Sequence, residues 1–219
     1  MKLNIIDKEN WVRKEHFDFY MKQIVMSYAV SADIEIGGFS NVIKREGLSF
    51  YPVMCWAVTK LINENQLFRL SLVDSSDVNA GVGYYDYLSP SYPILHNDTE
   101  SISVLCTEWN GDLRTFHDAH KKDTEKFKDD KSLHPRPLPP NILNVTSLPW
   151  LSFNGVSYQV KNGHNYLRPV IAWGKIYEKE GRLIMPVSFQ IHHAAADGYH
   201  TARFFKQLEE LCNNIDRYL

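Results

Sequence analysis

Several features that would assign a chain to a special class are scarce in this sequence. Only three cysteines, Cys55, Cys106 and Cys212, occur among its 219 residues. They are widely separated and lie in apolar segments, so we expect buried free thiols in a reducing compartment. Neither a disulfide framework nor a CxxC metal motif is present, and no repeat or low-complexity tract occurs.

The chain also lacks an excess of one charge and a long apolar run. Its formal net charge is -2, with Lys and Arg scattered among Asp and Glu, which excludes an extended basic surface for nucleic acid or an anionic membrane. No run of about 18 apolar residues occurs, and MKLNIIDKENW has no continuous apolar core like that of a signal peptide. We therefore expect a cytoplasmic protein that binds neither nucleic acid nor membrane.

What the sequence does contain is the pattern of an ordered α/β protein. With 44% hydrophobic and 23% charged residues it can bury a sizeable core, and we expect one domain spanning residues 1–219. Periodicity and turn residues predict helices and strands, with a rigid proline connector at 135–140. The expected helices are 10–23, 37–47, 52–64, 112–129 and one from 199. The expected strands are 27–36, one sheet of four within 68–109, and a hairpin of 167–178 with 182–191.

The segment FQIHHAAADGYHTARFF, residues 189–205, contains most of the reactive side chains that lie close together. We expect a strand up to Ile191, a turn over residues 192–196, and a helix that starts at Asp197. Three alanines in the turn allow close packing, which holds a histidine in one orientation. Histidine accepts and returns a proton near neutral pH. His193 is the better candidate base, because His192 continues the alternation of the strand.

Other interpretations of this segment remain open from the residues alone. Asp197 fits either the N-cap of a helix or a buried carboxylate that pairs with a cation. A histidine pair with a third histidine, His200, seven residues on matches no established zinc-ligand spacing such as HExxH. The histidines also fit a polar strand end with no chemical role.

The motif resembles the HHxxxDG signature of the CoA-dependent acyltransferase superfamily. Three further blocks, NWVRKEHFDFY, FYPVMCWAV and LPWLSF, occur in the order and at the spacing of the trimeric chloramphenicol acetyltransferases. The resemblance covers essentially the whole chain. It implies a two-layer α/β sandwich, in which helices cover a mixed sheet.

The resemblance also assigns catalytic roles. It implies that His193 is the general base, with one ring nitrogen bonded to its own backbone carbonyl. It implies a structural salt bridge between Asp197 and Arg13, which fits the cost of burying an unpaired cation beside aromatic residues. The family has an oxyanion-stabilising serine where this chain has Thr146, so we expect Thr146 to donate there, with Ser147 as the alternative.

The implied binding residues follow the family less closely. Ala172 stands where the family has a threonine that organises water, Ile176 where it has an aromatic, and Leu95 where it has a phenylalanine. Val156 and Tyr158 stand where it has an aromatic and then a leucine. The acceptor pocket is expected to include Phe19, Tyr20, Ile24, Leu95, Asn144, Val156 and Tyr158, and the acetyl-CoA site Tyr51, Trp150 and Lys175.

The resemblance predicts an O-acetyltransferase that uses acetyl-CoA and no metal, and that acts on chloramphenicol or a similar hydroxylated acceptor. It further implies a homotrimer with active sites at the subunit interfaces. The departures in the pocket leave two alternatives, namely transfer to another hydroxylated xenobiotic, or a non-catalytic protein of the same fold that binds a small ligand.

Overall fold

Most strands of the computed structural model, which describes residues 1–159 and 165–219, form one mixed sheet of seven strands. The β5–β7 and β7–β8 pairs are parallel and the other pairs are antiparallel. The strand order is β2 (Ser27–Glu35), β10 (Arg182–His192), β8 (Val170–Gly174), β7 (Ile142–Leu148), β5 (Ser89–His96) and β6 (Ser101–Cys106), and β9 (Tyr177–Lys179) pairs with β10. A smaller sheet has the order β1 (Leu3–Ile5), β4 (Asp77–Tyr85) and β3 (Leu70–Asp74).

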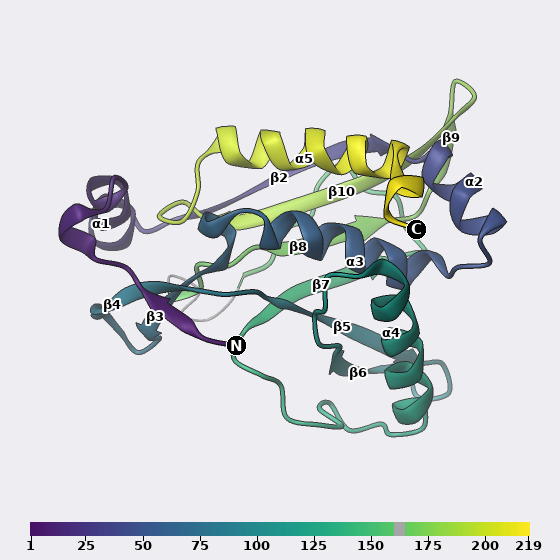
Figure 1. Ribbon diagram of the computed structural model, residues 1–219, viewed down its shortest axis with the longest axis horizontal. Coiled ribbons are helices and arrows are strands. Elements are labelled where there is room, and N and C mark those ends of the chain that lie inside the picture. The colour runs from purple at the N-terminus through teal and green to yellow at the C-terminus, as the bar shows by residue number, and fades with distance from the viewer. Residues whose placement is uncertain (160–164) are drawn as a thin grey trace.

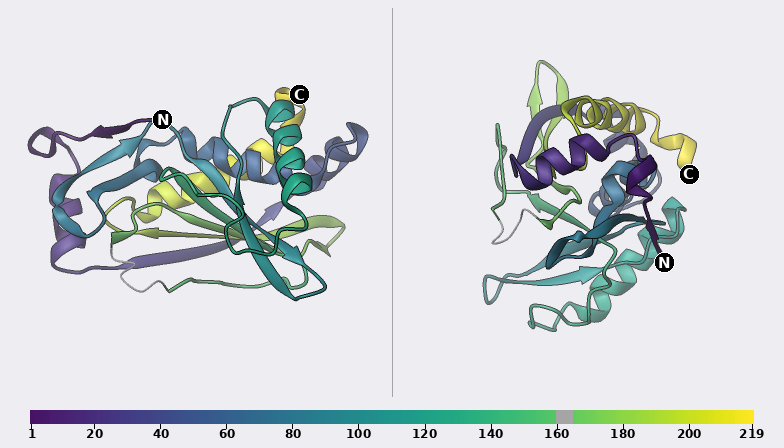
Figure 2. Two further views of the ribbon diagram at one scale, coloured as in Figure 1. Left: turned by 90° about the horizontal axis from the view of Figure 1, so that it is seen from below. Right: turned by 90° about the vertical axis from the view of Figure 1, so that its left-hand side faces the viewer.

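The helices form a second layer over the large sheet (Figures 1 and 2). They are α1 (Lys14–Lys22), α2 (Gly37–Arg45), α3 (Phe50–Asn63), α4 (Leu113–Phe127) and α5 (Gly198–Asn213), with short 3-10 turns at Lys8–Asn10, Gln66–Arg69 and Ile215–Tyr218. Helix α5 packs on β2 and α3, and α3 packs on β5 and α4. The expected mixed sheet covered by helices is therefore confirmed.

Strand β10 separates the core from the opposite side of the sheet. Phe189 points into the core, where its ring lies 5.0 Å from that of Phe68 and 4.8 Å from that of Phe204. On the other face Ser188 donates to the carbonyl of Val156 at 2.9 Å. The amide of Gln190 bonds both the N–H and the carbonyl of Tyr158. The alternation of a strand thus explains why polar side chains occur within an otherwise apolar run.

The predicted hairpin is confirmed at its turn. Arg182 pairs with Lys179, and the two residues between them, Glu180 and Gly181, have φ values of 52° and 76°. Two positive φ values are typical of the tight turns that match the twist of a hairpin, and glycine adopts them without strain.

Two expectations about local structure were wrong. The first helix does not begin after Asn10, because Asp7 accepts from the N–H of Glu9 and starts a separate three-residue turn. Trp11 is then extended, and α1 begins only at Lys14. The strands within 68–109 do not form one sheet, because β3 and β4 pair with β1 whereas β5 and β6 join the large sheet.

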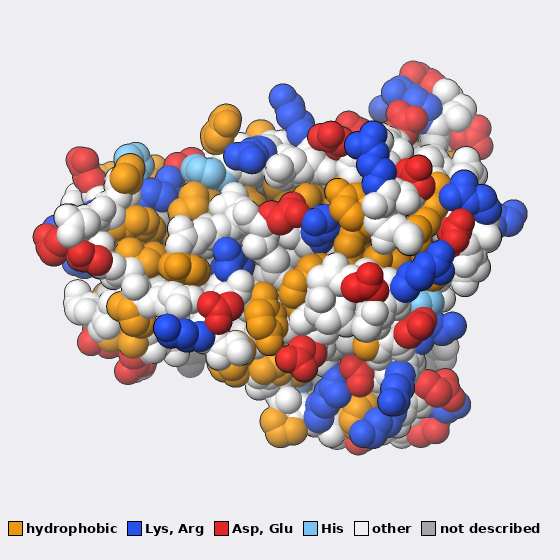
Figure 3. All heavy atoms as spheres, in the orientation of Figure 1, with side chains coloured by type: hydrophobic (Ala, Val, Ile, Leu, Met, Phe, Trp, Pro, Cys, Tyr) orange, Lys and Arg blue, Asp and Glu red, His pale blue; other side chains and the backbone are white. Residues whose placement is uncertain are grey.

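The surface and the thiols agree with the composition. All three cysteines lie in the described part of the chain and are buried and free. Acidic and basic side chains are interspersed over the face of the molecule in Figure 3. No helix among the described residues has the length and apolar character needed to cross a membrane.

Candidate active site

The turn between β10 and α5 is tightly packed and lies at the end of the molecule that carries α1 (Figure 1). Residues 194–196 are alanines with no exposed surface. The N–H of His193 donates to the carbonyl of Met26 at 2.9 Å, and the carbonyl of His192 accepts from the N–H of Ala195 at 3.0 Å. The direction in which His193 leaves the chain is therefore fixed.

Aromatic rings hold the imidazole of His193. The ring of Tyr20 is stacked on it, with centroids 3.9 Å apart and planes at 9°, and the ring of Tyr28 lies at 5.0 Å. Nδ1 is buried, lies 3.5 Å from Oδ1 of Asp197, and forms no hydrogen bond to another described residue. Because the side chain is 22% exposed, its open edge lies away from Nδ1, on the side of Nε2. The predicted bond to its own carbonyl stays a prediction.

Asp197 forms an ion pair with Arg13 across 184 positions of sequence. Nη1 of Arg13 lies 2.7 Å from Oδ2, and Nη2 lies 3.2 Å from Oδ1. Hydrogen bonds from Arg13 lower the pKa of Asp197 below its usual value, so the carboxylate is charged at neutral pH. The carboxylate thus joins α5 to the start of α1, and its place in catalysis stays a prediction.

Both interpretations of Asp197 hold, because it is also the N-cap residue of α5. Its N–H donates to Nδ1 of His200 at 3.1 Å. Burial and then the charge of Arg13 lower the pKa of His200, which keeps this ring neutral and able to accept that bond. His200, whose side chain is 23% exposed, therefore braces the turn.

His192 has a supporting position. It is 1% exposed, and its Nδ1 accepts from the N–H of Ala194 at 3.1 Å, within the turn that carries the candidate base. Among the described residues no group of three or more His, Cys, Asp or Glu side chains is placed to hold a metal ion. The expectation of a metal-free reaction stays a prediction.

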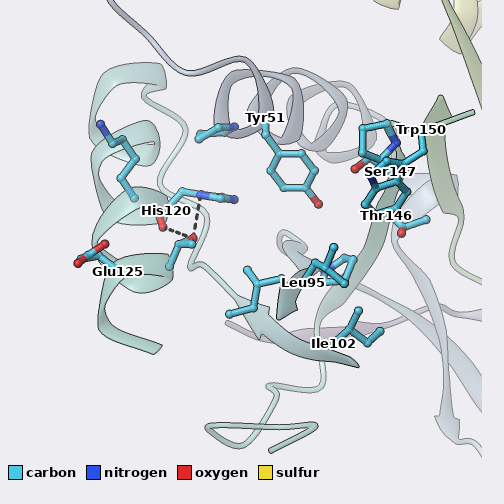
Figure 4. A pocket seen from close by; sticks show the side chains of 14 residues that line it. Tyr51, Leu95, Ile102, His120, Glu125, Thr146, Ser147 and Trp150 are labelled. Carbon is cyan, nitrogen blue, oxygen red and sulfur yellow. Dashed lines mark hydrogen bonds between the residues drawn. The ribbon is translucent and has the colours of Figure 1, made fainter. Parts of the chain in front are cut away.

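A second feature is a mainly apolar cavity of about 570 Å³ between α4, the start of α3 and the ends of β5 and β7. Thr146 and Ser147 both line it, as does Leu95 (Figure 4). A volume of this size suits a small organic molecule. The cavity therefore contains both candidate oxyanion donors and one of the expected pocket residues.

The structure does not bring the other expected pocket residues to this cavity. Phe19 and Tyr20 line a different depression along α1, and Ile24, which follows α1, is 52% exposed. Val156 and Tyr158 lie along β10 through the bonds described above. Asn144 donates from its amide to the hydroxyl of Tyr166 at 2.8 Å. These residues do not form one pocket within a single chain.

His193 and Thr146 are also far apart in one chain. Thr146 pairs with Ala172, Ala172 pairs with Ser188, and His193 lies five residues further along the chain. With about 3.3 Å per residue and about 4.8 Å between strands, the two positions are roughly 20 Å apart. The base must lie within hydrogen-bonding reach of the hydroxyl that it deprotonates, and the oxyanion donor must reach the carbonyl that this hydroxyl attacks, so both side chains must meet at one small group. One chain alone therefore does not assemble the expected site.

The expected acetyl-CoA residues lie near the cavity. Tyr51 and Trp150 line it, and Trp150 is 69% exposed. The N–H of Lys175 donates to the carbonyl of Leu151 at 3.0 Å, which places the end of β8 beside the Trp150 segment. A side chain at Gly174 would meet that carbonyl at 2.8 Å, so only glycine permits this approach.

Sequence reasoning did not identify two polar residues of these regions. Tyr28 packs against His193, and its hydroxyl lies 2.7 Å from Oγ1 of Thr201. His120 lines the cavity from α4. Tyr28 lies on an expected strand and His120 within an expected polar helix, where neither stood out as reactive. No spacing signal connects either residue to the HHAAADG turn, so only the fold identifies them.

Known proteins resemble this chain in sequence and fold over most of its length. The family model described as chloramphenicol acetyltransferase matches residues 1–209. A chloramphenicol acetyltransferase of Clostridium perfringens is 34% identical over 220 residues, which cover 100% of this chain and 99% of the relative. A solved chloramphenicol acetyltransferase structure superposes with a TM-score of 0.82 at 26% identity, covering 96% of this chain and 100% of that one. The dihydrolipoamide acetyltransferase of Azotobacter vinelandii has the same fold, with a TM-score of 0.67, 18% identity, and coverage of 93% and 88%.

Proposed function

Because the chain belongs to the chloramphenicol acetyltransferase family, we propose that it transfers the acetyl group of acetyl-CoA to a hydroxyl of chloramphenicol and so confers resistance. The observation that carries the proposal is the histidine turn. His193 is fixed by stacking on Tyr20 and by the Arg13–Asp197 pair beside it, and its Nε2 edge is open. This is the arrangement that a general base requires.

The reaction needs one proton transfer in each direction. His193 takes the proton of the acceptor hydroxyl on Nε2 while the hydroxyl oxygen attacks the thioester carbonyl carbon. The carbon–oxygen bond forms, the carbon–sulfur bond then breaks, and the imidazolium returns the proton to the leaving thiolate. The charged carboxylate of Asp197, 3.5 Å from Nδ1, stabilises the imidazolium between the two transfers.

The negative oxygen of the tetrahedral intermediate needs a hydrogen-bond donor. Thr146 is our first candidate, because it occupies the position of the family serine and its side chain lines the cavity. Ser147 lines the same cavity and remains the alternative. A preorganised hydroxyl at this point contributes more to the rate than it would in water.

The residues near the cavity fit acetyl-CoA as co-substrate, which supplies the acetyl group as a thioester. Trp150 offers an exposed aromatic surface at the rim, and Tyr51 presents a hydroxyl without a protein partner among the described residues. Lys175 is exposed next to the Trp150 segment, where its charge would attract phosphate groups. We place this reaction in the cytoplasm, in a single domain that spans the chain.

The active form is a homotrimer in which His193 of one chain meets Thr146 of the next. The separation of roughly 20 Å within one chain supports this assembly, since neither half of the site is complete alone. Exposed apolar side chains at the cavity, among them Ile102 at 47% exposure and Leu151, next to Trp150, at 61%, also favour a covered surface there.

A thiol-release assay tests the function. Wild type is expected to release CoA from acetyl-CoA only when chloramphenicol is present. Release with other hydroxylated compounds but not with chloramphenicol would favour the second candidate, a different xenobiotic acceptor, which the departures from the family at Leu95, Val156 and Tyr158 motivate. Binding of chloramphenicol without release from any acceptor would indicate a non-catalytic binding protein.

Subunit mixing tests the shared site. His193→Ala and Thr146→Val chains are each expected to be nearly inactive. When they are unfolded together and refolded as mixed trimers, about a quarter of the interfaces should carry both intact residues, and activity should return in that proportion. Mixed trimers that stay as inactive as the two separate variants would exclude a site shared between subunits.

A further inference from the structure

The wall of the cavity carries a histidine that the proposed mechanism does not use. His120 lies on α4, is 4% exposed, and lines the cavity opposite Thr146 (Figure 4). Its ring is stacked on that of Tyr92, with centroids 4.1 Å apart and planes at 18°. The ring therefore has one fixed position, and its Nε2 has no hydrogen-bond partner among the described residues.

The neighbours of His120 determine what Nε2 offers. The hydroxyl of Thr124 donates to the carbonyl of His120 at 2.9 Å, so its oxygen is left to accept from Nδ1–H, 3.5 Å away. Burial lowers the pKa of His120 to about 4, so the ring is neutral at neutral pH. A neutral ring protonated at Nδ1 has a bare lone pair at Nε2. The cavity wall thus presents a buried acceptor, which requires a donor.

A second polar atom lies close by. The ring of Tyr51 meets that of His120 edge-on at 5.6 Å. Its buried hydroxyl lies beside the thiol of Cys55, a weak hydrogen-bonding group, and forms no geometrically well-formed hydrogen bond in the described part of the chain. Buried polar atoms without partners are rare in native proteins, because leaving them unpaired is unfavourable. Two of them on one wall of an otherwise apolar cavity mark the place where a polar group of a ligand belongs.

We propose that His120 is a specificity-determining residue whose Nε2 accepts a hydrogen bond from a hydroxyl or amide N–H of the molecule in the cavity, with Tyr51 beside it. The proposal rests on the proposed function and deepens it. The donor belongs either to the acceptor, at a group other than the reacting hydroxyl, or to the pantetheine arm of CoA, whose amides have the same chemistry.

The test is His120→Phe, which keeps an aromatic ring against Tyr92, although a slightly larger one, and removes both ring nitrogens. The KM for the molecule that supplies the donor is expected to rise about 3- to 10-fold, with kcat changed less than 2-fold, because one neutral hydrogen bond of ground-state binding is lost. A rise for chloramphenicol alone assigns the donor to the acceptor, and a rise for acetyl-CoA alone assigns it to pantetheine.

Two controls separate recognition from folding. His117→Phe changes an equally buried histidine of α4 that does not line the cavity and accepts instead from the N–H of Ser49. It should lower Tm without raising either KM. If the donor belongs to the acceptor, 3-(4-nitrophenyl)propan-1-ol, which keeps the primary hydroxyl but lacks the amide and second hydroxyl of chloramphenicol, should bind wild type and His120→Phe equally.

Unchanged KM values for both substrates in folded His120→Phe would overturn the proposal, since solvent alone would then satisfy Nε2. The proposed function is judged separately, by turnover of the wild type. If wild type shows no turnover, calorimetric binding of CoA and of chloramphenicol to wild type and to His120→Phe makes the same comparison. Equal affinities for both ligands would overturn the proposal there as well.

Discussion

The His193 turn and the Thr146 cavity differ in how far the chain itself completes them. At the turn, Arg13 bonds Asp197 and the N–H of Asp197 bonds His200. Nδ1 of His193 forms no hydrogen bond to another described residue, but its ring is stacked on that of Tyr20, so one folded chain already fixes the base. In the cavity, the buried polar atoms Nε2 of His120 and Oη of Tyr51 are fixed in place but lack partners among the described residues. We infer from this difference that the base is preorganised, and we propose that a ligand and a second chain complete the cavity.

The largest expected effect comes from breaking the turn at its centre. His193→Ala should lower kcat/KM about 10³- to 10⁴-fold in the thiol-release assay, because the ring that accepts the hydroxyl proton is lost. His134→Ala, at an exposed histidine, is the control and should keep wild-type activity. Equal turnover in His193→Ala would refute the mechanism.

The next largest effect on activity is expected from a substitution in the cavity. Thr146→Val keeps the shape of the side chain and removes its hydroxyl, and kcat should fall about 10²-fold because the developing oxyanion loses a donor. Ser147→Ala should change kcat less than about 3-fold. The reverse ranking in the same steady-state assay would move the role of oxyanion donor to Ser147.

The stability of the protein at acid pH tests the cavity, because His120 is buried in its wall. The pKa of His120 is about 4 in the folded chain against 6.5 when exposed, because burial disfavours the charged ring. The free energy of unfolding is therefore unaffected by this group above pH ~6.5. It falls by up to ~3 kcal/mol as the pH decreases toward 4, because the unfolded chain binds a proton that the folded chain does not. The free energy of unfolding, measured by urea titration at several pH values, should fall less steeply with decreasing pH for His120→Phe than for wild type. Equal pH dependence in the two proteins would contradict this origin.

The smallest expected effect concerns the brace of the turn. Asp197→Asn should reduce the free energy of unfolding by ~1–2 kcal/mol, a value discounted because the Asp197 side chain is 32% exposed. Because Arg13 lowers the pKa of Asp197, this contribution is present above pH ~3.8 and is lost at lower pH. Denaturant titration of Asp197→Asn, Arg13→Met and the double variant gives the coupling energy.

The exposed pair of Lys14 and Glu9 supplies the control for that cycle. The side chain of Glu9 is 80% exposed, so Glu9→Gln should change stability by less than ~0.5 kcal/mol. If Asp197→Asn were as mild as Glu9→Gln, the ion pair would not brace the turn.

Much of the local structure was predictable because it depends on neighbouring residues. The end of α2 at Arg45, before Gly47 with φ of 66°, and the tight turn at Gly181 follow from glycine alone. The start of α1 was not predictable in this way, because Asp7 and Asn10 compete as caps and the sequence does not rank them.

The candidate site was predictable to the extent that it is one continuous segment. The strand, the alanine turn and the helix cap that position His193 all lie within residues 182–200. The partner of Asp197 came from the family resemblance, since residue types alone did not single out Arg13. The pocket residues were less predictable from the sequence, because their grouping depends on which strands are neighbours.

The sequence by itself determined the elements, the motif and the residue types available for acetyl transfer. Only the tertiary structure decided that Thr146 lies roughly 20 Å from His193 in one chain and that His120 faces the cavity. The physical reason is the distance along the sequence over which the interactions act. Helix periods and turns arise from interactions a few residues apart, whereas these relations depend on strand order and register, which are set by packing across the whole chain.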